Sequence, residues 1–198
     1  MPANGLLWLQ DSTSVLFDSG WNDAQTRALL RWAADSLHRP VRLAVITHAH
    51  PDRLGGLATP RAAGVRAIGL PLTAALARAA GMVGVSPIAS LEKTPVTFPG
   101  FELYYPGAGH TGDNIVAYVP ASHLLFGGCL VKEAGADDLG NIRNADLPQW
   151  PLAVAAVQAR YGHASIVVPG HGAPGSLTLL THTASLLAVH RGRAGSDE

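Results

Sequence analysis

The stretch THAHPDRLGG, residues 47–56, carries side chains that could bind a metal ion. His48 and His50 are two residues apart, Asp52 follows two residues later, and Arg53 comes next. On a helix this spacing would scatter the side chains, whereas on a tight loop that leaves a strand alternate side chains can converge on one side. A single histidine is more often a packing or surface residue, so the motif predicts a metal only if other loops supply further ligands.

Three later loops supply such residues: His110 in GHTGDN, Cys129 in FGGCLVK and His171 in VPGHG. Each follows a short apolar run and has glycine neighbours, which let the backbone approach a ligand closely. A catalytic zinc ion uses three nitrogen, sulfur or carboxylate ligands and keeps one position open. The six side chains therefore divide into two sites, one of imidazoles and one in which Asp52 and Cys129 join a histidine. The other histidines are expected on the surface or in packing: His38, His123, His163, His182 and His190.

The elements that must position these residues follow from apolar patterning and turn residues. Strands are predicted over 5–10, 14–20, 41–47, 65–70, 101–107, 114–120, 123–128 and 164–170, and helices over 22–40, 71–80, 147–162 and 175–190. This order predicts an α/β fold with two central mixed sheets and helices on the outer faces. We expect one domain over 1–190 and a disordered tail over 191–198. Four of the strands then end directly before a candidate ligand, and ligands of α/β sheets gather at such ends.

Composition excludes several classes of protein. The 14 basic and 14 acidic side chains cancel, so nothing in the charge predicts binding to nucleic acid or to an anionic membrane. No apolar run approaches the roughly 20 residues of a membrane span. Cys129 is the one cysteine, which rules out a disulfide within the chain. The N-terminus lacks the charged and small-residue segments of a signal peptide in the chain as given.

The motifs THAHPDRLGG, GHTGDN, FGGCLVK, LGNIRNADL and VVPGHGAPG resemble those of the zinc metallo-β-lactamases, in the family's order over residues 4–190. The matching subclass has a three-histidine site and an aspartate–cysteine–histidine site. The resemblance implies an αββα sandwich with two Zn²⁺ ions, the first held by His48, His50 and His110 and the second by Asp52, Cys129 and His171. It also implies a periplasmic protein, a monomer or weak dimer, whose partner is a small β-lactam molecule.

The resemblance further implies hydrolysis of the β-lactam amide of penicillins, cephalosporins and carbapenems by a metal-bound hydroxide, which confers antibiotic resistance. Asp52 would orient the nucleophile, and Asn141 would stabilise the oxyanion with the first zinc. Lys132 would bind the substrate carboxylate as a fixed positive charge. Taken alone, Lys132 would be a solvated surface lysine and Asn141 a turn residue.

Arg53 bears on which branch of the superfamily the chain resembles. Thioesterases, lactonases and RNA-processing nucleases carry a histidine there that binds the second metal, whereas a guanidinium has no lone pair to give. Cys129 would supply the missing ligand, and we expect Arg53 below the metals, where it offsets the charge of Asp52 and the thiolate. A surface salt bridge is the alternative.

Two departures from the family pattern leave other functions open. Pro51 stiffens the loop between His50 and Asp52. Family members also carry a few dozen residues, including a hairpin that closes over the substrate, before the segment matching PANGLL. The alternatives are therefore another superfamily hydrolase, such as a thioesterase or lactonase, or a zinc-binding homologue with weak or no activity because that flap is missing.

Overall fold

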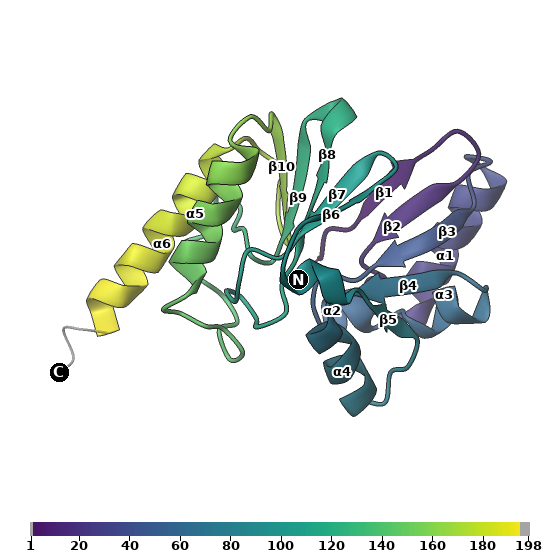
Figure 1. Cartoon of the computed structure of the whole chain (residues 1–198), viewed down its shortest axis with the longest axis horizontal. Helices are drawn as coiled ribbons and strands as arrows, with labels where there is room; N and C mark the ends of the chain where they lie inside the picture. Colours follow the sequence, from purple (N-terminus) through teal and green to yellow (C-terminus); the bar gives the residue numbers. More distant parts are fainter. Residues whose placement is uncertain (1, 195–198) are drawn as a thin grey trace. The chain divides into compact units, whose positions relative to one another are not determined.

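The structure is a computed structural model that describes residues 2–194. The chain divides into two compact units, one of Gly5–Lys93 and one of residues 94–194 together with residues 2–4. Each unit is built on one five-stranded sheet. Figure 1 labels the strands and helices of both units, which are described here one at a time.

The unit of residues 5–93 has a mixed sheet with strand order β1-β2-β3-β4-β5. Its strands are β1 (Leu6–Leu9), β2 (Ser14–Phe17), β3 (Val41–Val45), β4 (Arg66–Gly69) and β5 (Val85–Pro87), and its helices are α1 (Asp23–Asp35), α2 (Pro51–Leu54), α3 (Ala58–Ala62) and α4 (Pro71–Ala79), with a 3₁₀ turn at Ala89–Glu92. Only β1 runs antiparallel to its neighbour, so β2 to β5 all end at the same edge of the sheet.

Apolar residues of β2 and β3 form the core of this unit with side chains from α1, α2 and α4. The buried cluster comprises Leu16, Ala33, Val41, Ala44, Ile46, Leu54, Leu57, Val65, Ala67, Ala74, Ala77 and Val85. Helix α1 begins where the side chain of Asn22 accepts a hydrogen bond from the Gln25 amide at 2.9 Å. Such a cap satisfies a backbone donor that the first turn leaves without a helical partner.

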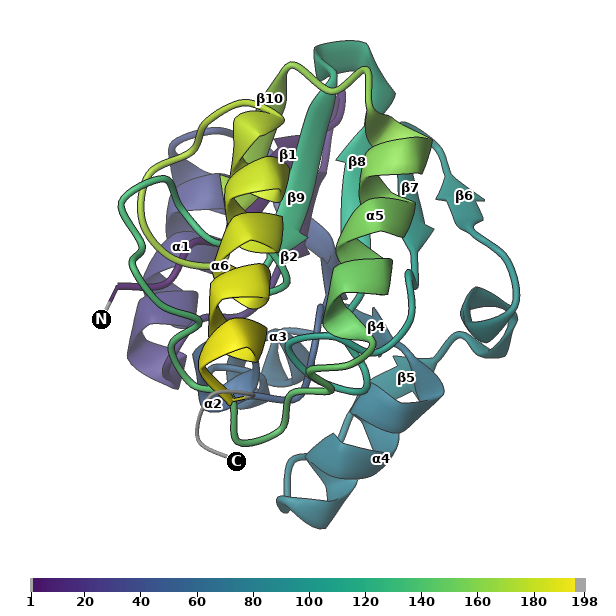
Figure 2. The same cartoon turned by 90° about the vertical axis from the view of Figure 1, so that its left-hand side faces the viewer.

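The second unit has strand order β10-β9-β8-β7-β6. Its strands are β6 (Val96–Phe98), β7 (Phe101–Tyr104), β8 (Val116–Val119), β9 (Leu124–Gly128) and β10 (Ile166–Pro169), and its helices are α5 (Trp150–Tyr161) and α6 (Thr178–Ala194), with a 3₁₀ turn at Pro120–Ser122. Strands β6 to β9 pair antiparallel, and β10 pairs parallel to β9. Helices α5 and α6 lie side by side (Figure 2) and pack on β8, β9 and β10 through one buried apolar cluster.

Helix α5 is also tied to strand β7 by a polar cluster. The Arg160 guanidinium donates from Nε and Nη2 to the two carboxylate oxygens of Glu102, both at 2.9 Å, and the Tyr161 hydroxyl donates to Glu102 at 2.6 Å. These donors hold the pKa of the Glu102 carboxyl below its usual range, Arg160 most strongly. The cluster therefore prefers the ionised carboxylate.

The strands and helices predicted from the sequence are all present, with ends shifted by a few residues. Four elements were missed, α2, α3, β5 and β6, because each has only three to five residues and shows no period. The expected tail at 191–198 is wrong in its first part, since α6 continues to Ala194. The single glycine there, Gly192, weakens a helix without ending it. Residues 195–198 lie outside the described part, within which no helix is long and apolar enough to cross a membrane.

Candidate metal centre

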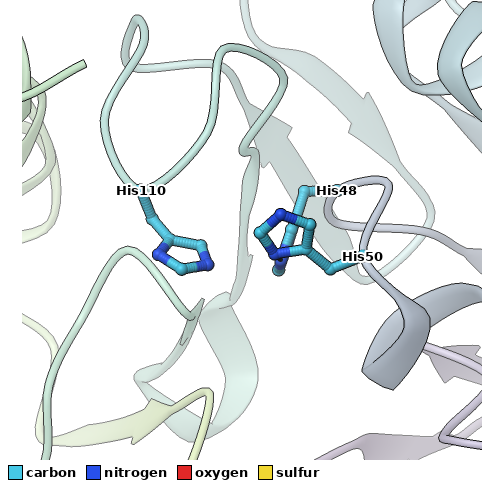
Figure 3. Close-up of side chains that lie close together, drawn as sticks. All are labelled: His48, His50 and His110. Carbon is cyan, nitrogen blue, oxygen red and sulfur yellow. Dashed lines mark hydrogen bonds between the residues drawn. The ribbon is translucent and has the colours of Figure 1, made fainter. Parts of the chain in front are cut away.

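His48 and His50 leave the carboxyl end of β3, as the alternation of the motif predicts. His48 is buried and His50 half-buried, and the Nε2 atom of His48 lies 3.2 Å from the Nδ1 atom of His50. Figure 3 shows their rings meeting edge to face, with centroids 4.8 Å apart. Two nitrogens on one tetrahedral zinc ion, each at about 2.0–2.1 Å, would be about 3.3 Å apart. The pair therefore already has the spacing that one zinc ion requires.

Asp52 and Arg53 lie on a short helix and not on the loop that we predicted. Helix α2 begins at Pro51, with His50 as its N-cap. Proline is favoured at this first helical position because its fixed φ suits the helix and its missing N–H would have no helical partner. Pro51, which the sequence marked as a departure, thus starts the helix that carries Asp52.

The pair Gly55–Gly56 lets helix α2 lie against the segment after β2. A Cβ atom on Gly55 would overlap the Trp21 carbonyl, and one on Gly56 would overlap the Thr26 hydroxyl. The Ser19 amide and hydroxyl both donate to the Arg53 carbonyl, at 3.0 and 2.8 Å. Only glycine leaves room for this contact, so the two residues that close the motif fix the position of α2.

Arg53 is fully buried between two carboxylates. Its Nη1 atom donates to Asp18 at 3.2 Å, and its Nε atom lies 3.0 Å from the Asp52 carboxylate. Asp18 also accepts from the Thr47 amide at 2.8 Å and from the Thr47 hydroxyl at 2.9 Å. Burial raises the pKa of Asp18 to about 6 against the opposing effect of Arg53, so the carboxylate is ionised at neutral pH. The alternative of a surface salt bridge is therefore wrong, because the guanidinium is fully buried against Asp18 and Asp52.

His110 lies in the second unit, on the loop that follows β7 (Figure 3). Asn114 shapes this loop, since its side chain accepts from the Thr111 amide at 3.0 Å and donates to the Gly107 carbonyl at 3.0 Å. The His110 ring packs against the ring of Trp150 with centroids 5.5 Å apart. The loop thus folds around a buried imidazole, and the contacts of Asn114 shape it.

Cys129 and His171 follow neighbouring parallel strands. Gly128 at the end of β9 is paired with Pro169 at the end of β10, so the two candidate ligands leave the same edge of the sheet. The thiol is buried and the imidazole half-buried. The His171 Nδ1 atom lies 2.8 Å from the Pro2 carbonyl oxygen. Because a carbonyl only accepts, Nδ1 carries a proton in this contact, and a neutral ring then has its lone pair on Nε2.

Lys132 and Asn141 lie in the same region of this unit. The Lys132 ammonium is 5.4 Å from the centroid of the Trp150 ring, close enough for a cation–π contact. It also lies beside Gly140, where an added Cβ would be 3.7 Å from Nζ. Asn141 is exposed, and its side chain accepts from the Arg143 amide at 3.2 Å.

Sequence reasoning missed the residues that support these side chains. Asp18 follows β2 as His48 follows β3, so the same rule about polar residues at strand ends would have found it. No feature of the sequence marked Trp150 or the Pro2 carbonyl, because Trp150 is an ordinary core residue and the carbonyl belongs to the backbone. Two of the histidines set aside as structural indeed have such contacts: His123 lies near the Tyr118 hydroxyl and His182 near the Ala136 carbonyl.

The family model described as the metallo-β-lactamase superfamily matches residues 3–171. The chain belongs to this superfamily. A metallo-β-lactamase type 2 of Bacillus cereus is 41% identical over 190 residues, which cover 94% of this chain and 73% of the relative. A solved metallo-β-lactamase of Pontibacter korlensis is 43% identical with a TM-score of 0.87, covering 94% of this chain and 87% of that one. Another, from Pseudomonas aeruginosa in its mono-zinc form, is 37% identical with a TM-score of 0.89, covering 96% and 84%.

The comparisons confirm the resemblance stated from the motifs. The predicted fold class, the metallo-β-lactamase α/β fold with two mixed sheets and flanking helices, is correct. The prediction of a hydrolase of the metallo-β-lactamase superfamily is likewise confirmed.

Proposed function

We propose that this superfamily member hydrolyses the amide bond of β-lactam antibiotics with two zinc ions. The observation that carries the proposal is the set of six donors in the described residues: His48, His50 and His110 as one group and Asp52, Cys129 and His171 as the other. Three neutral imidazoles suit a zinc ion that keeps one position open, and the thiolate and carboxylate of the second group suit another. The relatives named above as metallo-β-lactamases, one of them in a mono-zinc form, support the assignment.

The donors fit zinc in their protonation as well as their type. His48 and His50 direct nitrogens at one point, and His171 keeps the Nε2 lone pair because its Nδ1–H is engaged by a carbonyl. The Arg53 guanidinium lies 3.0 Å from the Asp52 carboxylate and attracts its ionised form. When bound, zinc would lower the pKa of water to about 7 and polarise the substrate carbonyl.

The chain's own residues then divide the remaining work. Asp52 accepts a hydrogen bond from the attacking water and orients it. Asn141 donates its amide hydrogens to the oxygen of the β-lactam carbonyl, and Lys132 binds the substrate carboxylate. Addition of water breaks the amide C–N bond, leaving a carboxylate on one side and a protonated nitrogen on the other. A host that makes the protein would gain resistance to β-lactam antibiotics.

Zinc binding and turnover of a chromogenic cephalosporin, measured on the same protein, test this proposal. We expect two zinc equivalents per chain, hydrolysis that a chelator abolishes and zinc restores, and loss of one equivalent in Cys129→Ser. A thioester and a lactone serve as comparison substrates, because they are the substrates of the alternative hydrolases. Hydrolysis of either with a higher kcat/KM than the cephalosporin, or zinc binding without β-lactam turnover, would contradict the proposal.

The proposed role of Lys132 has its own test. We expect Lys132→Ala to raise KM for a carboxylate-bearing β-lactam by about 10-fold or more with little change in kcat, since a hydrogen bond to a charged group is worth about 1.5–3 kcal/mol. Lys93→Ala, which removes an exposed lysine of the other unit, is the control. The rise in KM should vanish with a substrate whose carboxylate is esterified. Equal KM values for Lys132→Ala and Lys93→Ala would show that Lys132 does not bind the substrate carboxylate.

A further inference from the structure

The loop that carries His171 is held by the N-terminal residue Asn4. The Asn4 side chain donates to the carbonyls of Pro169 and Gly172, at 2.9 and 2.8 Å. Its backbone amide donates to the Gly170 carbonyl at 2.9 Å. One residue therefore makes three hydrogen bonds to a segment of four residues, and His171 lies in the middle of that segment.

The same N-terminal segment engages the His171 ring. The Pro2 carbonyl accepts from Nδ1 at 2.8 Å. This contact favours the tautomer in which Nε2 has the lone pair. Histidines that bind metals almost always donate their other ring N–H to a carbonyl or carboxylate, which fixes both the tautomer and the ring orientation. Residues 2–4 thus contact both the backbone of the loop and the ring of its histidine.

The opposite side of the loop is held by Glu133. Its carboxylate accepts from the Ala173 amide at 3.0 Å. Gly172 has a φ of 78°, and a Cβ added there would overlap the Glu133 carboxylate. The loop is therefore held by contacts with both Asn4 and Glu133.

We propose that residues 2–4 are a positioning element for the second zinc site, with Asn4 as the residue that fixes the loop and thereby keeps the His171 ring against the Pro2 carbonyl. The proposal rests on the proposed function, because His171 is a ligand only there. Asn4 acts through His171 and does not bind the metal or the substrate. Loss of such a supporting contact typically weakens metal affinity 10–100-fold.

Metal titrations of Asn4→Ala and Asn4→Asp test the proposal. The aspartate has the same shape, but its carboxylate cannot donate to the carbonyls of Pro169 and Gly172. With Co²⁺ as the probe, the equivalent bound by the Cys129 thiolate is identified by its near-ultraviolet charge-transfer absorption. We expect both variants to weaken that equivalent at least 10-fold and to leave the other within about 2-fold.

Asn22→Ala is the matched control. It removes a side-chain hydrogen bond of similar length in the other unit, where Asn22 caps α1. We expect both Co²⁺ equivalents to bind it as they bind the wild type. Thermal unfolding of the metal-free variants shows whether each is folded, so that affinity is compared only between folded proteins.

Imidazole ¹⁵N chemical shifts of the metal-free protein report the tautomer of His171 without any bound metal ion. We expect the Nδ1–H tautomer for His171 in the wild type and a mixture of tautomers in Asn4→Ala. The positioning role would be overturned if Asn4→Ala and Asn4→Asp bound the thiolate-bound Co²⁺ equivalent as tightly as the wild type, or if both Co²⁺ equivalents were weakened equally. The proposed function would still stand in that case, provided that the wild type binds two equivalents. A wild type that binds fewer than two equivalents would overturn both proposals.

Discussion

Arg53 illustrates how a single side chain at this site is constrained by charge. The guanidinium is buried with Asp18 and Asp52, and the three side chains together have one net negative charge when ionised. The inability of arginine to donate a lone pair was evident from the sequence, and from it we predicted that this chain differs from branches with a histidine there. Asp18 was not predicted, because its link to Arg53 spans 35 residues and depends on the pairing of β2 with β3.

At the residue scale we expect Asp18→Asn to lower the free energy of unfolding of the metal-free protein by about 1–3 kcal/mol, because its amide nitrogen replaces one of the two oxygens that accept from Thr47 and Arg53. Asparagine suits the left-handed backbone of residue 18, which has a φ of 66°, so the substitution isolates the charge. Urea unfolding measures the change, and Asp11→Asn in the exposed turn is the control. If the free energies of unfolding of the two variants differed by less than about 0.5 kcal/mol, the contacts of Asp18 with Arg53 would not stabilise the fold.

At the scale of helices and strands, the fold depends on hydrogen bonds between side chains of different elements as well as on the elements themselves. Helix α5 is held to β7 by Glu102 and Arg160, two residues far apart in the sequence. The spacing of apolar residues predicted the strand and the helix. It did not predict this contact, because a glutamate and an arginine are common at exposed positions of any strand or helix. Likewise α2 was missed because four residues cannot show a helical period, although Pro51 marked its start.

The Glu102 cluster predicts a specific pH dependence. Because the folded-state pKa of Glu102 lies below its unfolded value, its contribution to stability is present above the unfolded pKa and is lost as the pH falls through the folded one. We expect Glu102→Gln to destabilise the protein at pH 7 and to lose less stability than the wild type on acidification. Urea unfolding at a series of pH values measures this, with the exposed Glu92→Gln as control. Parallel pH profiles for wild type and Glu102→Gln would contradict it.

At the scale of the molecule, the proposed ligands are shared equally between the two units. His48, His50 and Asp52 come from residues 5–93, and His110, Cys129 and His171 come from the other unit. The sequence could predict that each ligand follows a strand, because ligands gather at strand ends, but it predicted one domain and not two units. It could not predict the supports of the site, which are backbone carbonyls, a buried tryptophan and glycines next to bulky neighbours.

Zinc binding should stabilise the folded protein. Binding to the folded state alone adds about 2.7 kcal/mol per site when zinc is 100-fold above its Kd. For a chain of this length we expect the Tm to rise by about 5–10 °C per site. Scanning calorimetry with chelator, with zinc and with the same concentration of magnesium measures the shift. If zinc left the Tm unchanged, or if magnesium raised it equally, the prediction that zinc stabilises the folded protein would be wrong.

The location of Trp150 has a consequence for observing the protein in solution. This buried indole lies between the His110 ring and the Lys132 ammonium. Its emission should be blue-shifted relative to that of the exposed Trp21 and Trp32. Fluorescence from residue 150 would therefore change when a metal binds the His110 ring that packs against the indole, and it would respond again when a ligand draws Lys132 away. The protein thus contains its own optical reporter of metal loading and substrate capture.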